Sequence, residues 1–223
     1  MLTWGLLALL GVIAGRYARE LALGFGPDPV DTRKEARAAL SHAVRVVPVP
    51  GKPFLVEGAT GLAFGVLAWR YAAAPELIPA LLLAAWAGVV LTLTDLRCWR
   101  LPDVITLPAY PILLAALVPT GRLMVAAACG LAMAGIYLIL WFGRPSGLGF
   151  GDVKLAGLVG LVAGAVSINT AIYAGLGGQL LGGLWALGLL ITRKGTRTSE
   201  FPFGPAMIAG ALAALLAGAS SHI

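Results

Sequence analysis

Apolar residues dominate this chain in long stretches, and short polar segments separate them. Eight of these stretches are long enough to cross about 30 Å of hydrocarbon as helices, some of them only with the help of polar flanks. They run over residues 2–16, 57–74, 77–95, 103–119, 122–142, 152–167, 169–192 and 203–219. The pattern predicts an all-α, polytopic membrane protein with about eight transmembrane helices.

The composition agrees with this class. Hydrophobic residues make up 59% of the chain and charged residues 12%, and the mean hydropathy is +0.91. An ordinary soluble domain carries about a quarter charged residues, so the composition excludes that class. The net charge of +6 comes without interleaved basic and aromatic residues, so we expect anionic membrane lipid, and no nucleic acid, as its partner.

The basic residues lie almost entirely on one side of the predicted spans. With the amino terminus outside, only Arg70 and Arg122 face outward. No basic residue precedes the first apolar run, so we expect an uncleaved first span. The cytoplasmic side then receives Arg16, Arg19, Arg33, Lys34, Arg37, Arg45, Lys52, Arg97, Arg100, Arg144, Lys154, Arg193, Lys194 and Arg197.

One inter-helix segment is long, and it runs from about residue 15 to residue 56. Its middle predicts a short helix that begins with Asp31 or Thr32 as the cap and ends near Val44. Three prolines, at positions 48, 50 and 53, follow this helix and stiffen the return of the chain. The segment is either a solvated, basic connector or a surface that binds a substrate or partner.

Three acids, Asp95, Asp103 and Asp152, lie at cytoplasmic ends of predicted spans. An acid at membrane depth is costly, which marks it as a candidate functional residue. Two carboxylates that lie close together cannot both ionise cheaply, so such a pair can hold one proton near neutral pH. That arrangement suits an aspartic protease, in which the ionised acid activates a water and the protonated acid polarises the scissile carbonyl.

Four motifs, in order along the chain, resemble those of the type IV prepilin peptidase family. They are Val-Glu with Thr-Gly-Leu at residues 56–62, Asp-Leu-Arg-Cys-Trp-Arg-Leu-Pro-Asp-Val-Ile-Thr-Leu-Pro at 95–108, Gly-Phe-Gly-Asp-Val-Lys-Leu at 149–155, and Pro-Phe-Gly-Pro at 202–205. Members of this family are intramembrane aspartic proteases of the Gly-x-Gly-Asp class. The resemblance implies an endopeptidase that removes the leader from type IV prepilins or pseudopilins at the cytoplasmic face of the bacterial cell membrane, without a cofactor.

The resemblance also implies roles for single residues. The two catalytic acids of the family fall on Asp95 and Asp152, whereas Asp103 matches an acid that is not catalytic. Because Asp103 follows Pro102, we expect it to cap the fourth predicted span and to meet the positive end of the helix dipole.

Four further residues are candidates that support the site or bind substrate. Gly149 and Gly151 are expected to permit a tight turn with positive φ and to let a peptide backbone approach Asp152. Lys154 is either a topology anchor at the interface or an influence on the acid pair or on an acidic group of the substrate. Glu57 suits the amino terminus of a helix, with a role in substrate positioning as the alternative.

Two pairs of glycines spaced four residues apart predict close helix packing, one pair in the predicted span 152–167 and the other in the span 169–192. The pairs lie at positions 160 and 164 and at positions 178 and 182, and Gln179 lies beside the second pair. Small residues let membrane helices approach closely, and a buried amide can hydrogen-bond across the contact. Such spacing is usually plain packing; if these two spans pack against each other in this way, they would help to hold Asp152 in place.

The two cysteines, Cys98 and Cys129, have neither a disulfide framework nor metal-ligand spacing. Bifunctional members of the resembled family bind zinc through two cysteine pairs in the cytoplasmic segment and methylate the cleaved pilin. Residues 16–56 contain no cysteine, so a four-thiolate zinc site is impossible there, and we expect no methyltransferase activity. The predicted organisation is a first transmembrane helix over 1–16, a reduced cytoplasmic loop over 17–56 and a membrane domain over 57–223.

Two alternatives stay open. A peptidase of the preflagellin or Tad-pilus kind would use the same acids on a different substrate. A transporter or an inactive scaffold would use them to bind a proton or a cation. The sequence shows no convincing internal repeat and no acid deep in the middle of a span, which argues against a transporter.

Overall fold

A computed structural model of the chain describes residues 2–27, 31–45, 54–143, 148–192 and 202–218. Within these ranges the regular structure is helical. Short 3-10 turns precede α4 and follow α5, at Pro75–Leu77 and Val118–Thr120. The α-helices are α1 (Leu2–Leu23), α2 (Thr32–Arg45), α3 (Leu55–Arg70), α4 (Ile78–Cys98), α5 (Asp103–Leu117), α6 (Leu123–Gly143), α7 (Phe150–Val166), α8 (Ile168–Ile191) and α9 (Gly204–Gly218).

A helix stands at each predicted span, and α2 is the short helix predicted within residues 15–56. Three helix ends were predicted wrongly, because α1 continues to Leu23 and α4 to Cys98, while α3 already ends at Arg70. Among the described residues, four stretches are long and apolar enough to cross a membrane: Pro75–Cys98, Asp103–Thr120, Leu123–Gly143 and Ile168–Ile191. The chain is thus a membrane protein. Its total of eight spans and its outward amino terminus stay predictions.

Some predicted features lie outside the described residues. These are the prolines at 48, 50 and 53, together with Lys52, Arg144, Arg193, Lys194 and Arg197.

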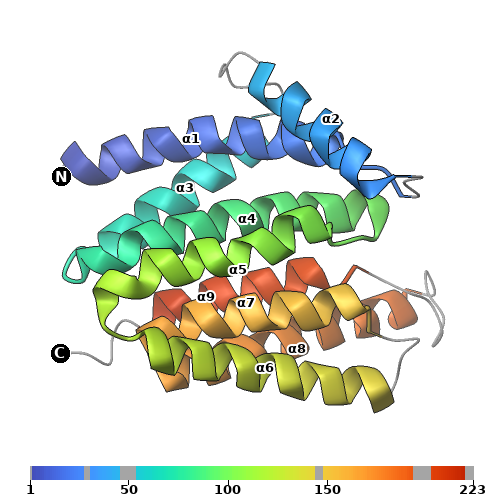
Figure 1. Ribbon diagram of the computed structural model, residues 1–223. Helices are drawn as coiled ribbons and strands as arrows, with labels where there is room; N and C mark the ends of the chain where they lie inside the picture. Colours follow the sequence, from blue (N-terminus) through green and yellow to red (C-terminus); the bar gives the residue numbers. More distant parts are fainter. Residues whose placement is uncertain (1, 28–30, 46–53, 144–147, 193–201, 219–223) are drawn as a thin grey trace. The chain divides into compact units, whose positions relative to one another are not determined.

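The contacts divide the chain into two units, Met1–Ala116 and Leu117–Ile223. In the first unit, α1 and α3 lie side by side (Figure 1) and meet through small residues. A Cβ atom on Gly11 would lie 2.8 Å from the Cα atom of Gly61, and one on Gly15 would lie 2.8 Å from the Cα atom of Glu57. Glycine is therefore needed at both positions, because any side chain would force the helices apart.

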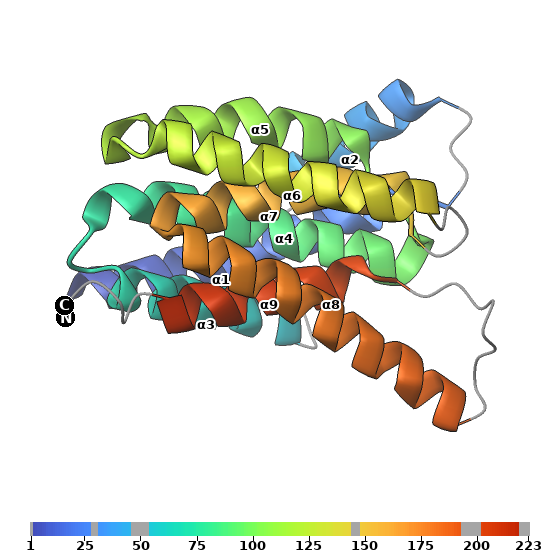
Figure 2. The same cartoon turned by 90° about the horizontal axis from the view of Figure 1, so that it is seen from below.

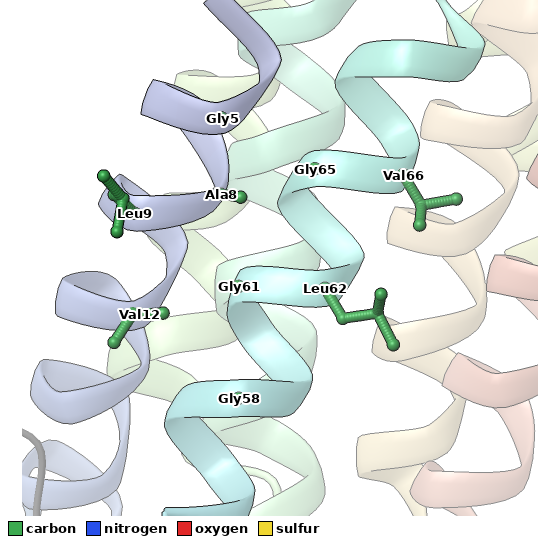
Figure 3. A pocket seen from close by; sticks show the side chains of 9 residues that line it. All are labelled: Gly5, Ala8, Leu9, Val12, Gly58, Gly61, Leu62, Gly65 and Val66. Carbon is green, nitrogen blue, oxygen red and sulfur yellow. The ribbon is translucent and has the colours of Figure 1, made fainter. Parts of the chain in front are cut away.

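An apolar groove runs along this α1–α3 contact (Figure 3). In Figure 3, Gly61 and Gly65 of α3 lie on the side of α1, while the side chains of Leu62 and Val66 point away from it. The residues that line the groove are Gly5, Ala8, Leu9, Val12, Gly58, Gly61, Leu62, Gly65 and Val66.

The carboxyl-terminal part of α1 packs against α2 and α4. A buried cluster joins Ala18, Leu21, Ala22 and Phe25 to Ala39 and Ala43 of α2 and Val90 of α4. This packing explains why α1 extends past its apolar stretch. The charges met there are paired, since Arg16 Nη1 lies 2.6 Å from Glu20 Oε1, and His42 Nδ1 lies 3.6 Å from Glu20 Oε2.

In the second unit, α7 contacts α6, α8 and α9, and α8 lies beside α9 (Figure 2). Almost every residue of α7 is buried, which fits a helix that is apolar on all sides. The guanidinium of Arg122, just before α6, donates a 2.5 Å hydrogen bond to the carbonyl of Val166. It thereby satisfies one of the last carbonyls of α7.

The glycine pairs pack closely, but not against each other as predicted. Gly160 and Gly164 of α7 face α6, where a Cβ on Gly160 would lie 2.6 Å from the carbonyl oxygen of Cys129. Gly178 and Gly182 of α8 face Met207 of α9 and the Phe203 ring. The expectation that α7 and α8 meet through these glycines was therefore wrong, because each pair contacts a different neighbour.

Candidate active site

Asp95 lies in the last turn of α4, one turn further inside the helix end than predicted. It is buried, with 6% of its surface exposed. The helix ends at Trp99, which has φ 57° and ψ 33° and donates its backbone N–H to the carbonyl of Asp95 over 2.9 Å. Among the described residues Trp99 is the only one other than glycine with positive φ. A bulky residue is strained in this left-handed conformation, so the surrounding structure must hold the turn in place.

Side chains that follow Asp95 bind the end of α1 and the residues just after it. Arg97 Nη1 donates to the carbonyl of Ala22 over 2.9 Å, and Cys98 Sγ donates to the carbonyl of Phe25 over 3.2 Å. Arg100 Nη1 donates to the carbonyl of Gly26 over 2.6 Å. These contacts account for the extension of α4 beyond Asp95, because they satisfy polar groups that would otherwise end the helix.

Asp103 is the first residue of α5 and is exposed. Pro102, directly before it, accepts hydrogen bonds from the backbone N–H groups of Ile105 and Thr106, at 3.0 and 3.1 Å. Pro102 therefore stands at the cap position that was predicted for Asp103. The carboxylate of Asp103 still lies in the first turn, where a negative charge is favourable.

Glu57 lies in the first turn of α3, as predicted, but its partner was not foreseen. Its carboxylate is 1% exposed, and Oε2 lies 2.6 Å from Nη2 of Arg19 on α1. A buried carboxylate needs such a partner, because leaving it unpaired would be costly. The pair joins α1 to α3, and the part of Glu57 in substrate positioning stays a prediction.

Asp152 lies at the third position of α7 and is buried. Its Oδ2 accepts a 3.0 Å hydrogen bond from the backbone N–H of Gly149, and Gly149 stands at the cap of the helix. Gly149 has φ −75° and ψ 148°, and Gly151 lies within the helix. The predicted positive φ at these two glycines was therefore wrong, because the chain enters α7 from an extended residue.

Lys154 is half-buried beside an aromatic cluster at the start of α7. Its Nζ lies 5.1 Å from the centroid of the Phe150 ring, which permits a cation–π contact. The Phe150 ring in turn meets Trp141 of α6 edge-on, at 5.5 Å. These contacts fix the side chain of Lys154 close to the turn that carries Asp152, and its influence on the acids stays a prediction.

Tyr137 of α6 is a neighbour of Asp152 that the sequence motifs did not reveal. It is buried, and its hydroxyl lies near enough to Asp152 and to Gln179 of α8 for both side chains to influence it. Gln179 itself is exposed, so it is not the buried amide that the sequence led us to expect at a helix contact. The ring of Phe203, from the Pro-Phe-Gly-Pro motif, lies 6.4 Å from the Tyr137 ring. The motif therefore lies next to Tyr137, a neighbour of Asp152.

The described residues contain no group of three or more His, Cys, Asp or Glu side chains that could hold a metal ion. Cys98 and Cys129 are both free thiols. Asp95 belongs to the first unit and Asp152 to the second, and their pairing stays a prediction.

Residues 81–187 match the model of the type IV leader peptidase family. This segment contains Asp95, Asp103 and the Gly-Phe-Gly-Asp motif. Curated relatives carry the name "Prepilin leader peptidase/N-methyltransferase". The chain is similar to one from Aeromonas salmonicida, with 33% identity over 179 residues, covering 74% of the chain and 58% of the relative.

Two further relatives have the same name. The one from Pseudomonas putida is 35% identical over 173 residues, covering 72% of the chain and 57% of the relative. The one from Bacillus subtilis is 28% identical over 170 residues, covering 74% of the chain and 65% of the relative. The chain thus spans less than two thirds of the length of these relatives, and it matches no solved structure. The family match and these relatives show that the chain belongs to the type IV leader peptidase family.

Proposed function

We propose that this chain is an intramembrane aspartic endopeptidase that removes the leader from type IV prepilins or pseudopilins, with Asp95 and Asp152 as its catalytic pair. One observation carries the proposal: the segment that matches the family contains both acids, and both are buried at helix ends. The relatives named prepilin leader peptidase support the choice of substrate.

The two acids differ in their helical surroundings, and this difference suggests a role for each. Asp152 lies in the first turn of α7 and accepts the Gly149 N–H, and both features stabilise a negative charge. Asp95 lies in the last turn of α4, where the helix dipole disfavours a negative charge. We therefore assign Asp152 as the ionised base and Asp95 as the protonated acid.

In this mechanism Asp152 takes a proton from a water molecule, and the water oxygen forms a bond to the scissile carbonyl carbon. Asp95 donates a hydrogen bond to the carbonyl oxygen, which gains negative charge as the carbonyl carbon becomes tetrahedral. The C–N bond then breaks as a proton from the acid pair passes to the nitrogen of the leaving amine. The products are the carboxyl end of the leader and the free amino terminus of the pilin.

The glycines before Asp152 suit the approach of a peptide backbone. Gly149 carries no side chain, and a Cβ built there would lie 3.4 Å from Asp152 Oδ2. A larger residue would therefore occupy the space beside the carboxylate. Gly151, two residues further on, adds no side chain either, so an extended substrate could lie along this turn.

The proposed setting is the bacterial cell membrane, with eight spans, an outward amino terminus and the acids at the cytoplasmic face. The domain organisation is that predicted from the sequence, with spans over 1–16 and 57–223 and a cytoplasmic segment over 17–56. Membrane lipid is the second partner. Because a prepilin has a basic leader in the cytoplasm and an apolar helix in the membrane, its scissile bond would lie at the level of the acids.

The proposal is tested by co-expressing a prepilin with the chain and following removal of the leader by the change in gel mobility. Asp95→Asn and Asp152→Asn should each abolish cleavage while the protein stays in the membrane fraction. Glu76→Gln is the matched control, since it makes the same change at an exposed acid before α4 and should cleave normally. Full activity of either Asn variant would refute the catalytic pair, and the same assay separates a peptidase from a scaffold.

A further inference from the structure

Three side chains at and just after the end of α4 bind one short segment at the end of α1. We call this segment the connector and define it as residues 24–26 together with the carbonyl of Ala22. The donors are Arg97, Cys98 and Arg100, with distances of 2.9, 3.2 and 2.6 Å to carbonyl oxygens. All three donors follow Asp95 by two to five residues. The position of the Asp95 backbone therefore depends on where the connector lies.

Glu35 of α2 binds the same connector from its other side. Its Oε1 accepts a 2.7 Å hydrogen bond from the backbone N–H of Gly26 and lies 3.7 Å from Arg100 Nη1. Gly26 is thus held through its N–H by Glu35 and through its carbonyl by Arg100. Both side chains are largely shielded, with 13% of Glu35 and 28% of Arg100 exposed, so water competes only partly for these contacts.

The helix that supplies Glu35 is fixed by close packing as well. Ala36, Ala39 and Ala43 form its buried face. A Cβ on Gly24 would lie 2.5 Å from the Cβ of Ala39, so α2 approaches the connector as closely as a glycine permits. This contact sets the distance between α2 and the connector, and it brings Glu35 within reach of Gly26.

The strained turn at the end of α4 belongs to the same set of contacts. Trp99 adopts its left-handed conformation between Cys98 and Arg100, and the turn it makes lets the donors on both sides of it reach the connector. Such strain persists only where the surrounding structure enforces it. The hydrogen bonds of Cys98 and Arg100 are the local interactions that enforce it.

We propose that the connector, Glu35 and Arg100 form a clamp that holds the last turn of α4 and places Asp95 for peptide cleavage. Glu35 and Arg100 are then positioning residues. The inference rests on the proposed function, because it assigns the clamp to an acid of the catalytic pair. It also gives the cysteine-free segment a definite task, which the sequence alone left open between a solvated connector and a binding surface.

The test measures the clamp and the chemistry separately, in a Cys129→Ala background where Cys98 is the remaining thiol. Cys98 is buried and bonded to the connector, so its rate of labelling by N-ethylmaleimide reports opening of the clamp. Prepilin cleavage in detergent gives kcat and KM. The variants are Glu35→Ala, which removes both contacts of the carboxylate, and Glu35→Gln, which keeps an acceptor for the Gly26 N–H. Arg37→Gln, at an exposed position of the same helix, is the matched control.

We expect Glu35→Ala to raise the labelling rate of Cys98 by about tenfold, because a hydrogen bond to a charged group is lost. The kcat should fall by a similar factor with KM little changed, Glu35→Gln should lie between, and Arg37→Gln should match the background. Unchanged labelling in Glu35→Ala would overturn the clamp. Faster labelling with unchanged kcat would overturn its positioning role. A parent chain that cleaves no prepilin would instead refute the proposed function, and labelling would still decide whether the clamp exists.

Discussion

Arg19 of α1 and Glu57 of α3 form an ion pair with 2.6 Å between Nη2 and Oε2, and Glu57 is almost completely buried. The pair lies at the glycine contact between the two helices, since a Cβ on Gly15 would meet Glu57 itself. It therefore combines a charge interaction with the closest approach of α1 and α3. Substitutions that remove the ion pair test the charge interaction and the helix contact together.

Glu57→Ala should lower the free energy of unfolding by about 3–5 kcal/mol, because it leaves the largely shielded guanidinium of Arg19 without this partner. The double variant Arg19→Met/Glu57→Leu should recover most of that loss, since it removes both charges and keeps the volume. Thermal unfolding in detergent measures both. Equal loss in the single and double variants would show that the charge pairing contributes nothing.

Gly160→Ala should destabilise the second unit by about 1–3 kcal/mol, because an added methyl group overpacks the contact with α6. The new Cβ would lie 2.6 Å from the carbonyl oxygen of Cys129 and 2.9 Å from the Cβ of Met133. Gly135→Ala on α6 is the control, since a Cβ there meets nothing within 4 Å. It should be neutral or stabilise by up to about 1 kcal/mol. Similar unfolding temperatures for the two variants would contradict the close contact of α6 and α7.

Trp99→Gly should keep prepilin cleavage and raise stability by about 1 kcal/mol, because glycine adopts positive φ without strain. Trp99→Val should lose both stability and cleavage, since a β-branched residue is least suited to this conformation. Both variants lack the indole, so comparing them by thermal unfolding and by leader removal separates the effect of the backbone conformation from the effect of losing the indole. Retained function in Trp99→Val would mean that the left-handed turn is dispensable.

A pilin processed by this chain alone should have an unmethylated amino terminus. The relatives are named for both activities, but residues 16–56 contain none of the cysteines that would form the zinc site expected of bifunctional members. Mass spectrometry of the mature pilin distinguishes the two forms directly, because methylation replaces a hydrogen of the amino terminus by a methyl group and so raises the mass. A methylated amino terminus would show that the transferase does not depend on that site.

The apolar pattern predicts where each helix lies, but not where α1 and α4 end. Both helices continue through charged residues because those residues find partners on other helices: Arg19 binds Glu57 of α3, and Arg97 binds the carbonyl of Ala22. A hydropathy pattern scores such residues as helix ends, since it does not include tertiary contacts. The same limit explains why the partner of Glu57 was not predicted.

The motifs identify the two acids and the glycines beside Asp152, but not their local conformation. The spacing of Gly149 and Gly151 is compatible with a left-handed turn as well as with the extended cap that the chain adopts. Tyr137 escapes any motif, because one tyrosine in an apolar helix is not distinguishable from a packing residue. Its proximity to Asp152 and to Gln179 arises from the packing of α6, α7 and α8.

The alanine face of α2 has a kinetic consequence. Methyl groups bury little apolar area each, so the attachment of α2 depends strongly on Glu35 and its polar contacts. Such an element is expected to exchange its amide hydrogens through local opening, long before the almost fully buried α7 does. The surroundings of the two acids would then lie at opposite ends of the protection scale. Asp152 would stand on a helix that opens only with global unfolding, and Asp95 beside a segment that detaches and rebinds many times while the rest of the protein stays folded.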